Sequence, residues 1–476
     1  MRVSSAPWNE CPCKLSSALP TDFNVGTLAG SRRAGKGNGG ANGEFPVFDC
    51  ESDLLDRALD RFVGPVRRGA LPGGDEPQVP NDAAAFALVS VEPSEAVRID
   101  AARRGFTHVH RWGVLPSRKI PRWMLPLGNR SAAMAATRIY EPLARTTRIM
   151  KSLVIRGMQM GWKSWARHEV LIASRGPLPL ELLVRQVTGE PHPMFALSVG
   201  NQRTMRKLTV LAMRPDGEIL GYMKLPLTDA ATQRVRNEAA ILQRLWNYPA
   251  LRPHLPRILY AGSYNESYLL FQSPSMGPLG PTGLVGIHEK FLQVLWGVHR
   301  AERPGKLLIE EVALQWEQCA AQRENEWEEL GQEVLRRSTR ALGQVTIPSG
   351  VMHGDFAPWN TRVEHGRLFL FDWESAAWEA PIAWDIFHFQ VQTACFLKKG
   401  RGFSGRQWEG TEEMSFLLYL LSSAAQLIAE GADRTGINYR RELLTKCLSE
   451  KTSQEAVGVP AGRKRWDSAI TKGLYD

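Results

Sequence analysis

The chain has few cysteines and no long, uninterrupted apolar run. Six cysteines occur in 476 residues, and only Cys11 and Cys13 are close in sequence. Without a second close pair, neither a zinc site nor a disulfide framework is favoured, and we expect a reducing, cytoplasmic environment. The longest apolar stretch, residues 416–429, is interrupted by polar side chains and is too short to span a bilayer, so it predicts a buried helix and no transmembrane segment. An apolar core typical of a signal peptide is also missing after Met1.

A glycine-rich stretch at residues 30–43 lacks two parts that a phosphate-binding P-loop needs. Gly37 stands where the loop requires a hydroxyl side chain, and the sequence that follows it does not favour a helix. Such a composition cannot build a packed core. We therefore expect residues 1–44 to form a disordered tail.

Negatively charged residues are scarce between residues 101 and 175. This segment holds 15 lysines and arginines against two acids, Glu141 and Glu169, whereas the whole chain carries a net charge of +10. The excess predicts either a solvated basic face or a site for an anionic partner, such as a phosphosugar, a lipid headgroup or nucleic acid. Cations next to large aromatics, as in Arg111-Trp112 and Arg122-Trp123, suit sugar rings or anionic headgroups.

The first part of the chain is expected to fold separately from the rest. Apolar residues recur at helical spacing between Leu54 and Phe62, and residues 84–91 form a compact apolar run that suits a buried strand. Residues 93–104 suit a helix, whereas residues 111–129 have no clear period. We predict a small basic α/β domain of unknown role over residues 45–185.

The stretch from His353 to Glu374 concentrates polar side chains that chemistry could use. Asp355 and Asn360 lie five residues apart in one loop, and a predicted hairpin with a turn at residues 365–366 returns the chain to Asp372. The three oxygen-bearing side chains of Asp355, Asn360 and Asp372 are then expected to lie together. Mg²⁺ prefers oxygen ligands and is usually held by one or two carboxylates together with substrate phosphates.

This stretch resembles the catalytic region of the aminoglycoside phosphotransferase and choline kinase-like family, which shares the protein kinase-like fold. The resemblance covers roughly residues 190–450, and its motif continues through Pro381 and Asp385, although Glu379-Ala380 replaces the glycine usual before that proline. It implies Asp355 as the catalytic base, His353 as a brace for the loop, and Asn360 and Asp372 as Mg²⁺ ligands. The role of Glu374 stays open between tuning the metal site and capping the turn.

The same resemblance implies a nucleotide site upstream. Three expected strands, residues 195–198, 207–213 and 218–224, precede a helix at 230–245 and a strand running into a hinge at 268–274. In kinase-like proteins a strand lysine pairs with ATP phosphates and with a helix glutamate, which fits Lys224 and Glu238. The remaining cofactor-binding candidates lie on the loop at the end of the first strand and at the hinge: Ser198, Gly200 and Gln272.

Strands followed mostly by helices predict an α+β, two-lobed protein kinase-like domain. The small N-lobe is expected over residues 186–275, and the helical C-lobe, with the catalytic loop, over residues 276–476. Helices are expected at residues 287–300, 312–342, 382–397, 412–429 and 440–448.

The leading functional hypothesis is an ATP- and Mg²⁺-dependent phosphotransferase acting on a hydroxyl of a small molecule, such as a sugar, an amino alcohol or an aminoglycoside. One alternative is a non-catalytic nucleotide-binding scaffold. Another is a kinase acting on an anionic glycan, lipid or nucleic acid recruited by the basic segment at residues 101–175. The sequence leaves open the acceptor, the choice between ATP and GTP, and the oligomeric state.

Overall fold

The computed structural model describes residues 51–64, 67–70, 86–90, 95–116, 121–142, 145–160, 168–200, 205–397, 408–432 and 434–451. The expected tail, with Cys11, Cys13 and the P-loop-like stretch, lies outside these residues. Residues 50–476 cluster as one compact unit. Among the helices that the structure describes, none is both long enough and apolar enough to cross a membrane.

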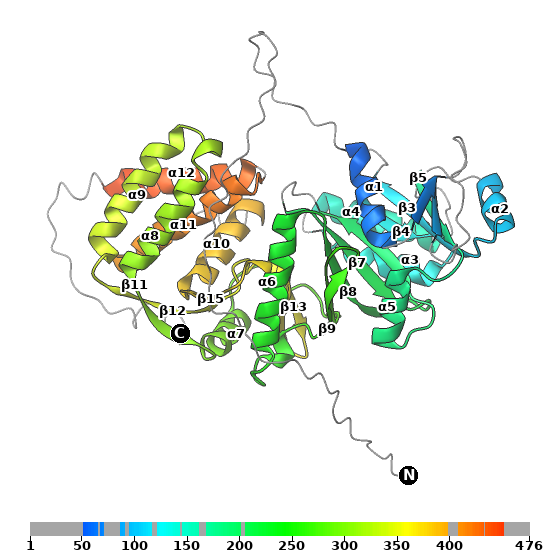
Figure 1. Ribbon diagram of the computed structural model, residues 1–476. Helices are drawn as coiled ribbons and strands as arrows, with labels where there is room; N and C mark the ends of the chain where they lie inside the picture. The colour runs from blue at the N-terminus through cyan, green and yellow to red at the C-terminus, as the bar shows by residue number, and fades with distance from the viewer. Residues whose placement is uncertain are drawn as a thin grey trace, which may run out of the picture. The chain divides into compact units, whose positions relative to one another are not determined.

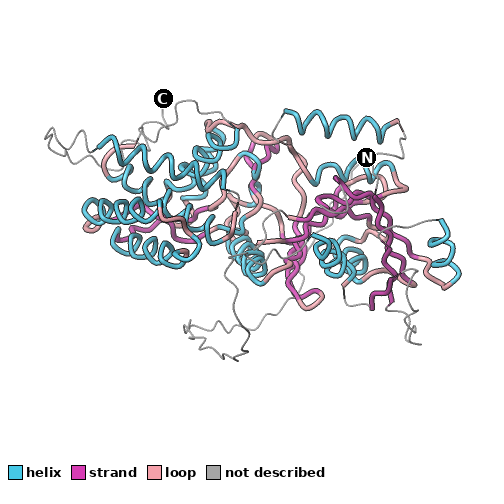
Figure 2. Tube along the Cα trace, turned by 90° about the horizontal axis from the view of Figure 1, so that it is seen from above, coloured by secondary structure: helices cyan, strands magenta, loops and turns pink. Residues whose placement is uncertain are grey.

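A ten-stranded sheet dominates the first half of the chain (Figure 1, Figure 2). Its first two strands are parallel and all other neighbours are antiparallel. In sheet order the strands are β1 (Arg67–Ala70), β2 (Phe86–Ser90), β5 (His168–Ser174), β3 (His108–Pro116), β4 (Pro121–Pro126), β6 (Met194–Val199), β7 (Lys207–Met213), β8 (Ile219–Pro226), β10 (Ser267–Gln272) and β9 (Ile258–Tyr264).

The sheet does not stop at the boundary expected near residue 185. Strand β4, from the basic segment, pairs with β6, the first strand of the expected N-lobe, and Trp112 Nε1 donates a hydrogen bond to the Phe195 carbonyl at 2.8 Å. Phe62 on α1 (Glu51–Val63) packs edge-on against both aromatic rings. The expectation of a separate domain over residues 45–185 therefore needs correction, because the two regions share one sheet and one apolar core.

Helices accompany this sheet at several points. In sequence order, those after α1 are α2 (Glu95–Arg103), α3 (Arg130–Ala136), α4 (Arg145–Gln159), α5 (Pro179–Thr188) and α6 (Asp229–Leu245). Helix α6 begins where the Thr228 side chain accepts a hydrogen bond from the Ala231 backbone, which satisfies one otherwise free amide of the first turn. Its buried face, including Val235 and Ala239, packs on Leu270 of β10 and holds the helix against the sheet.

The second half of the described chain is mainly helical, as expected. Its helices are α7 (Gly286–Trp296), α8 (Gly305–Gln318), α9 (Glu326–Leu342), α10 (Ala383–Leu397), α11 (Thr411–Ala429) and α12 (Arg434–Lys451). This half also contains a three-stranded sheet of β11 (Arg300–Pro304), β12 (Thr346–Met352) and β15 (Ala377–Pro381). A separate hairpin is formed by β13 (Thr361–Glu364) and β14 (Arg367–Leu370). The α+β, two-lobed fold class is confirmed.

One stretch that was expected to form a single helix forms two helices in the structure. The apolar period over residues 312–342 predicted a single element, whereas α8 ends at Gln318 and α9 begins at Glu326. Arg323 lies in the break, where its guanidinium stacks over the Trp316 ring and pairs with Glu328. Three acids occupy the first turn of α9, where a helix dipole favours negative charge.

Candidate active site

The hairpin of β13 and β14 brings the loop with Asp355 and Asn360 close to the turn that begins at Asp372. Thr361 pairs with Leu370 across the hairpin, and the Phe371 amide donates to the Asn360 carbonyl at 3.2 Å. The two strands therefore hold Asn360 next to the residue that precedes Asp372. The expected return of the chain to this loop is confirmed.

Asp355 has both carboxylate oxygens held by neighbours. Asn360 Nδ2 donates to Asp355 Oδ2 at 2.8 Å, and His388 Nε2 lies 2.9 Å from Asp355 Oδ1. One third of the Asp355 side chain is exposed, and it lines a cavity of about 640 Å³. The carboxylate is thus fixed in orientation and open to a small molecule.

His353 is buried beneath this loop. Its Nδ1 accepts a hydrogen bond from the Asp355 amide at 3.2 Å, so Nε2 carries the proton and donates to the Phe371 carbonyl at 3.1 Å. Burial lowers the pKa of His353 to about 4, which keeps the ring neutral. The imidazole ties the loop to the chain just before Asp372.

Asp385 at the start of α10 holds the loop from the other side. Its two oxygens accept hydrogen bonds from the amides of His353 and Gly354 at 2.8 and 3.0 Å. Burial raises the pKa of Asp385 to about 6 despite these bonds. Gly354 has a φ of +79°, and a Cβ there would collide with the Ser375 carbonyl, so the loop requires glycine at this position.

A second cluster forms around the ammonium of Lys224. Lys224 Nζ lies 2.5 Å from Glu238 Oε2 on α6 and 2.6 Å from Asp372 Oδ1. Glu238 is fully buried, and its other oxygen accepts from Gln272 Nε2 at 2.9 Å. Burial opposes the ammonium charge, but the carboxylates of Asp372 and Glu238 outweigh it and raise the pKa of Lys224.

Asp372 adopts a backbone conformation that is uncommon for a residue with a side chain. Its φ of 69° and ψ of 54° lie in the left-handed region, where strained residues often mark functional sites. Burial alone would raise the pKa of this carboxyl, but Lys207 and Lys224 hold it well below its usual range. The Asp372 side chain is therefore ionised between two cations.

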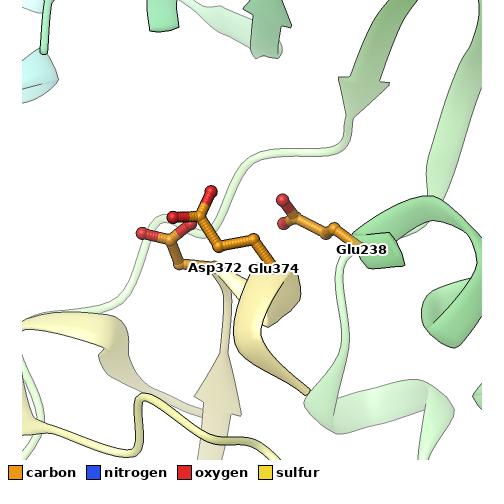
Figure 3. Close-up of side chains that lie close together, drawn as sticks. All are labelled: Glu238, Asp372 and Glu374. Atoms are coloured by element: carbon orange, nitrogen blue, oxygen red, sulfur yellow. The ribbon is translucent and has the colours of Figure 1, made fainter. Parts of the chain in front are cut away.

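Three carboxylates, from Glu238, Asp372 and Glu374, come within 4.8 Å of one another through one oxygen each (Figure 3). Asp372 and Glu374 lie side by side, and Lys207 pairs with both. Burial and the nearby Asp372 charge raise the pKa of Glu374. Oxygen donors of this kind suit Mg²⁺, and the Asn360 amide group, which donates its hydrogens to Asp355, still has its oxygen to offer.

Part of the chain is similar to a known protein family. Residues 222–409 match the family model described as the phosphotransferase enzyme family. This segment, which is under half of the chain, is therefore similar to that family. The match includes the loop at residues 353–360 and also Lys224, Glu238 and Asp372, and it confirms the expected resemblance over these residues.

Several solved structures also align with this chain. Aminoglycoside phosphotransferase APH(4)-Ia aligns with a TM-score of 0.40 and 12% identity, covering 57% of this chain and 97% of its own. The streptomycin-ATP-APH(2")-IIa ternary complex aligns with a TM-score of 0.38 and 14% identity, covering 57% of this chain and 97% of its own. No curated protein sequence matches this chain.

The other predicted site residues do not contact the Asp355 loop or the Lys224 cluster in the same direct way, apart from Gln272, which donates to Glu238. Ser198 pairs with Thr209 in the sheet, and the Gly200 amide donates to the Lys207 carbonyl at 3.0 Å, so both lie at the end of β6 near Lys207. The next residue of that expected loop, Asn201, lies outside the described residues. Nucleotide binding by Ser198, Gly200 and Gln272 stays a prediction.

Two residues of the site were not anticipated. Lys207 begins β7 and pairs with the acidic turn, and His388 contacts Asp355 from α10. His388 follows Asp385 by three residues, a spacing that puts both on one face of a helix. That spacing was the available signal for His388, whereas Lys207 has no local feature that separates it from other lysines.

Proposed function

We propose that this protein is a phosphotransferase that transfers the terminal phosphate of ATP to a hydroxyl of a small molecule in the presence of Mg²⁺. The proposal depends mainly on the position of the Asp355 carboxylate, which Asn360 and His388 orient at the wall of a cavity. A positioned carboxylate in such a place suits a base that receives the proton of an acceptor hydroxyl. As the acceptor oxygen bonds to phosphorus, the bond from phosphorus to ADP breaks.

The second cluster supplies the charge that a nucleotide needs. Lys224, held by Glu238, fits a role in neutralising phosphate charge. Asp372, with Glu374 next to it, and Asn360, which the hairpin holds beside Phe371, are suited to hold Mg²⁺. The ion would offset the charge that develops on the transferred group. In this proposal the Glu374 side chain belongs to the metal site rather than to a turn cap.

The proposal is tested by ADP release from the full chain. ATP and GTP are each supplied with Mg²⁺ and a panel of sugars, amino alcohols, hydroxy acids and aminoglycosides, and product is confirmed by mass spectrometry. Acceptor-dependent ADP release that disappears in Asp355→Asn supports the proposal. Nucleotide binding without transfer to any acceptor would favour a non-catalytic scaffold instead. Recruitment of an anionic partner by residues 101–175 stays a separate prediction.

A further inference from the structure

The cavity next to Asp355 contains a buried arginine that has no acidic partner among the described residues. Arg440 of α12 is 1% exposed and lines the same cavity of about 640 Å³. Its Nε donates to Ser423 Oγ at 2.7 Å, and one terminal nitrogen donates to the Gly436 carbonyl at 3.0 Å. Within the described part of the chain, no carboxylate lies within 4.0 Å of this guanidinium.

Such an arrangement is costly unless a ligand completes it. An arginine stays protonated in a protein, and neutral oxygens replace only part of the water that a buried guanidinium loses. The other two arginines of the cavity wall are paired: Arg234 with Glu430 and Arg303 with Glu311, both at 2.5 Å. Arg440 is thus the arginine of this wall whose positive charge is not offset by a described carboxylate and can bind an anionic group in the cavity.

A continuous row of polar side chains connects Arg440 to the candidate base. His388 contacts Asp355 at 2.9 Å through Nε2, and its Nδ1 lies 3.2 Å from the Tyr419 hydroxyl. Tyr419 and Ser423 are one turn apart on α11, and Ser423 accepts from Arg440. One small molecule that fills the cavity can therefore meet both Asp355 and Arg440.

A second observation points to a ligand rich in hydroxyls. Gln392 is 8% exposed and lines the same cavity. One end of its amide contacts His388, whereas the other is buried without a partner in the described structure. A hydroxyl of a bound molecule would satisfy that free amide atom. Trp359 and Trp384 add aromatic surface to the wall, which suits the carbon face of a polyhydroxylated ligand.

We propose that the acceptor is a hydroxylated carboxylic acid, whose carboxylate binds Arg440 while a hydroxyl faces Asp355. The substrate class rests on the proposed function, but the binding site does not. A guanidinium matches a carboxylate through two parallel hydrogen bonds. A carboxylate carries a single charge that offsets one guanidinium, whereas a doubly charged phosphate ester would share the cavity with Glu311 and Glu430.

The first experiment measures binding to the full chain by calorimetry without nucleotide. Matched probes are glucuronate with glucose, gluconate with glucitol, and glycerate with glycerol, together with glucosamine and glucose 1-phosphate. We expect at least one acid to bind about tenfold or more tightly than its neutral partner. If no acid exceeds its partner, or if glucosamine binds best, the proposal is wrong. If glucose 1-phosphate binds better than every acid, a phosphate ester replaces the carboxylate.

Variants then test whether Arg440 is responsible. Arg440→Gln should abolish the preference for the acid, while Arg440→Lys, which retains the charge but loses the planar fork, should keep part of it. The matched control is Arg441→Gln on the same helix, because Arg441 pairs with Glu324 and Glu326. Thermal unfolding checks each variant for folding. An equal preference in Arg440→Gln and wild type would overturn the assignment.

Turnover separates this inference from the proposed function. Binding of the acid through Arg440 without ATP-dependent phosphorylation would leave the binding site standing and reject the phosphotransfer role of the cavity. If acids are phosphorylated, Arg440→Gln should raise the acceptor KM about tenfold or more and leave the KM for ATP unchanged. Efficient phosphorylation of neutral or cationic acceptors, with the same KM in wild type and Arg440→Gln, would contradict the substrate class.

Discussion

Lys224 Nζ lies 2.6 Å from Asp372 Oδ1 and so connects the ten-stranded sheet to the turn after β14. The same ammonium is 2.5 Å from Glu238 on α6, so three elements distant in sequence meet at one atom. In a poorly solvated site these charges interact strongly, and removing one leaves the others uncompensated. The predictions that follow rest on this arrangement and on the neighbouring loop.

Lys224→Met should lower kcat/KM for ATP by about 100-fold or more. The substitution keeps the length of the side chain but removes the cation from fully buried Glu238 and from the expected phosphate position. Steady-state kinetics with varied ATP measures the effect. Lys306→Met is the control, because Lys306 is 72% exposed on α8. Similar losses in both variants would argue against a specific role for Lys224.

Asp355→Asn should lower the rate of phosphate transfer by about 100- to 10,000-fold, because an amide cannot take the proton of the acceptor. Affinity for the nucleotide should stay the same, since the Lys224 cluster is untouched. Single-turnover transfer gives the rate and calorimetry gives the affinity. Transfer at a rate near that of wild type would remove Asp355 from the role of base.

Asp372→Asn should weaken binding of Mg-ATP by about tenfold or more, because the site loses its ionised carboxylate while Lys207 and Lys224 remain. Asparagine is the suitable replacement because it tolerates the left-handed conformation at this position. Calorimetry with and without Mg²⁺ should show that the gain in affinity on adding Mg²⁺ is largely lost. An unchanged gain would move the metal site elsewhere.

His288 should make folding stability depend on pH. Burial lowers its pKa to about 4, below the value of about 6.5 expected in the unfolded chain. The contribution is therefore present above pH 6.5 and is lost as the pH falls toward 4, by up to about 2 kcal/mol at pH 5.

His288→Phe should reduce the difference in unfolding free energy between pH 7 and pH 5, as measured with urea. The aromatic ring preserves packing against Phe356 and Phe389. His365→Asn is the control, because His365 is exposed at the hairpin turn and asparagine suits its φ of 49°. An equal pH dependence in His288→Phe and wild type would contradict the prediction.

Sequence patterns predicted those parts of the fold that are local. The helix expected at residues 230–245 is α6, the strand at 207–213 is β7, and the loop and hairpin around Asp355 and Asp372 are in the expected order. These features depend on short-range periodicity and turn chemistry, which a single sequence contains. Their catalytic roles stay predictions.

Features that depend on distant contacts could not be predicted in this way. Lys207 matters because it pairs with Asp372, which is more than 160 residues away in sequence. Arg440 matters because it lines the cavity. The pairing of β4 with β6 is equally remote. Residues 111–129 have no clear period because buried positions follow one another in β3 and β4 instead of alternating with exposed ones. Local patterning says nothing about which strand becomes a neighbour.

The continuity of the ten-stranded sheet has a practical consequence for dissecting this protein. Cutting the chain at residue 186 would strip β6 of β4 and leave an open edge strand, while Phe195 would lose the cover of Phe62 and Trp112. Open apolar edges promote self-association. A fragment of residues 186–476 should therefore aggregate rather than behave as an independent catalytic core, so the basic segment has to be probed by point substitution in the intact chain.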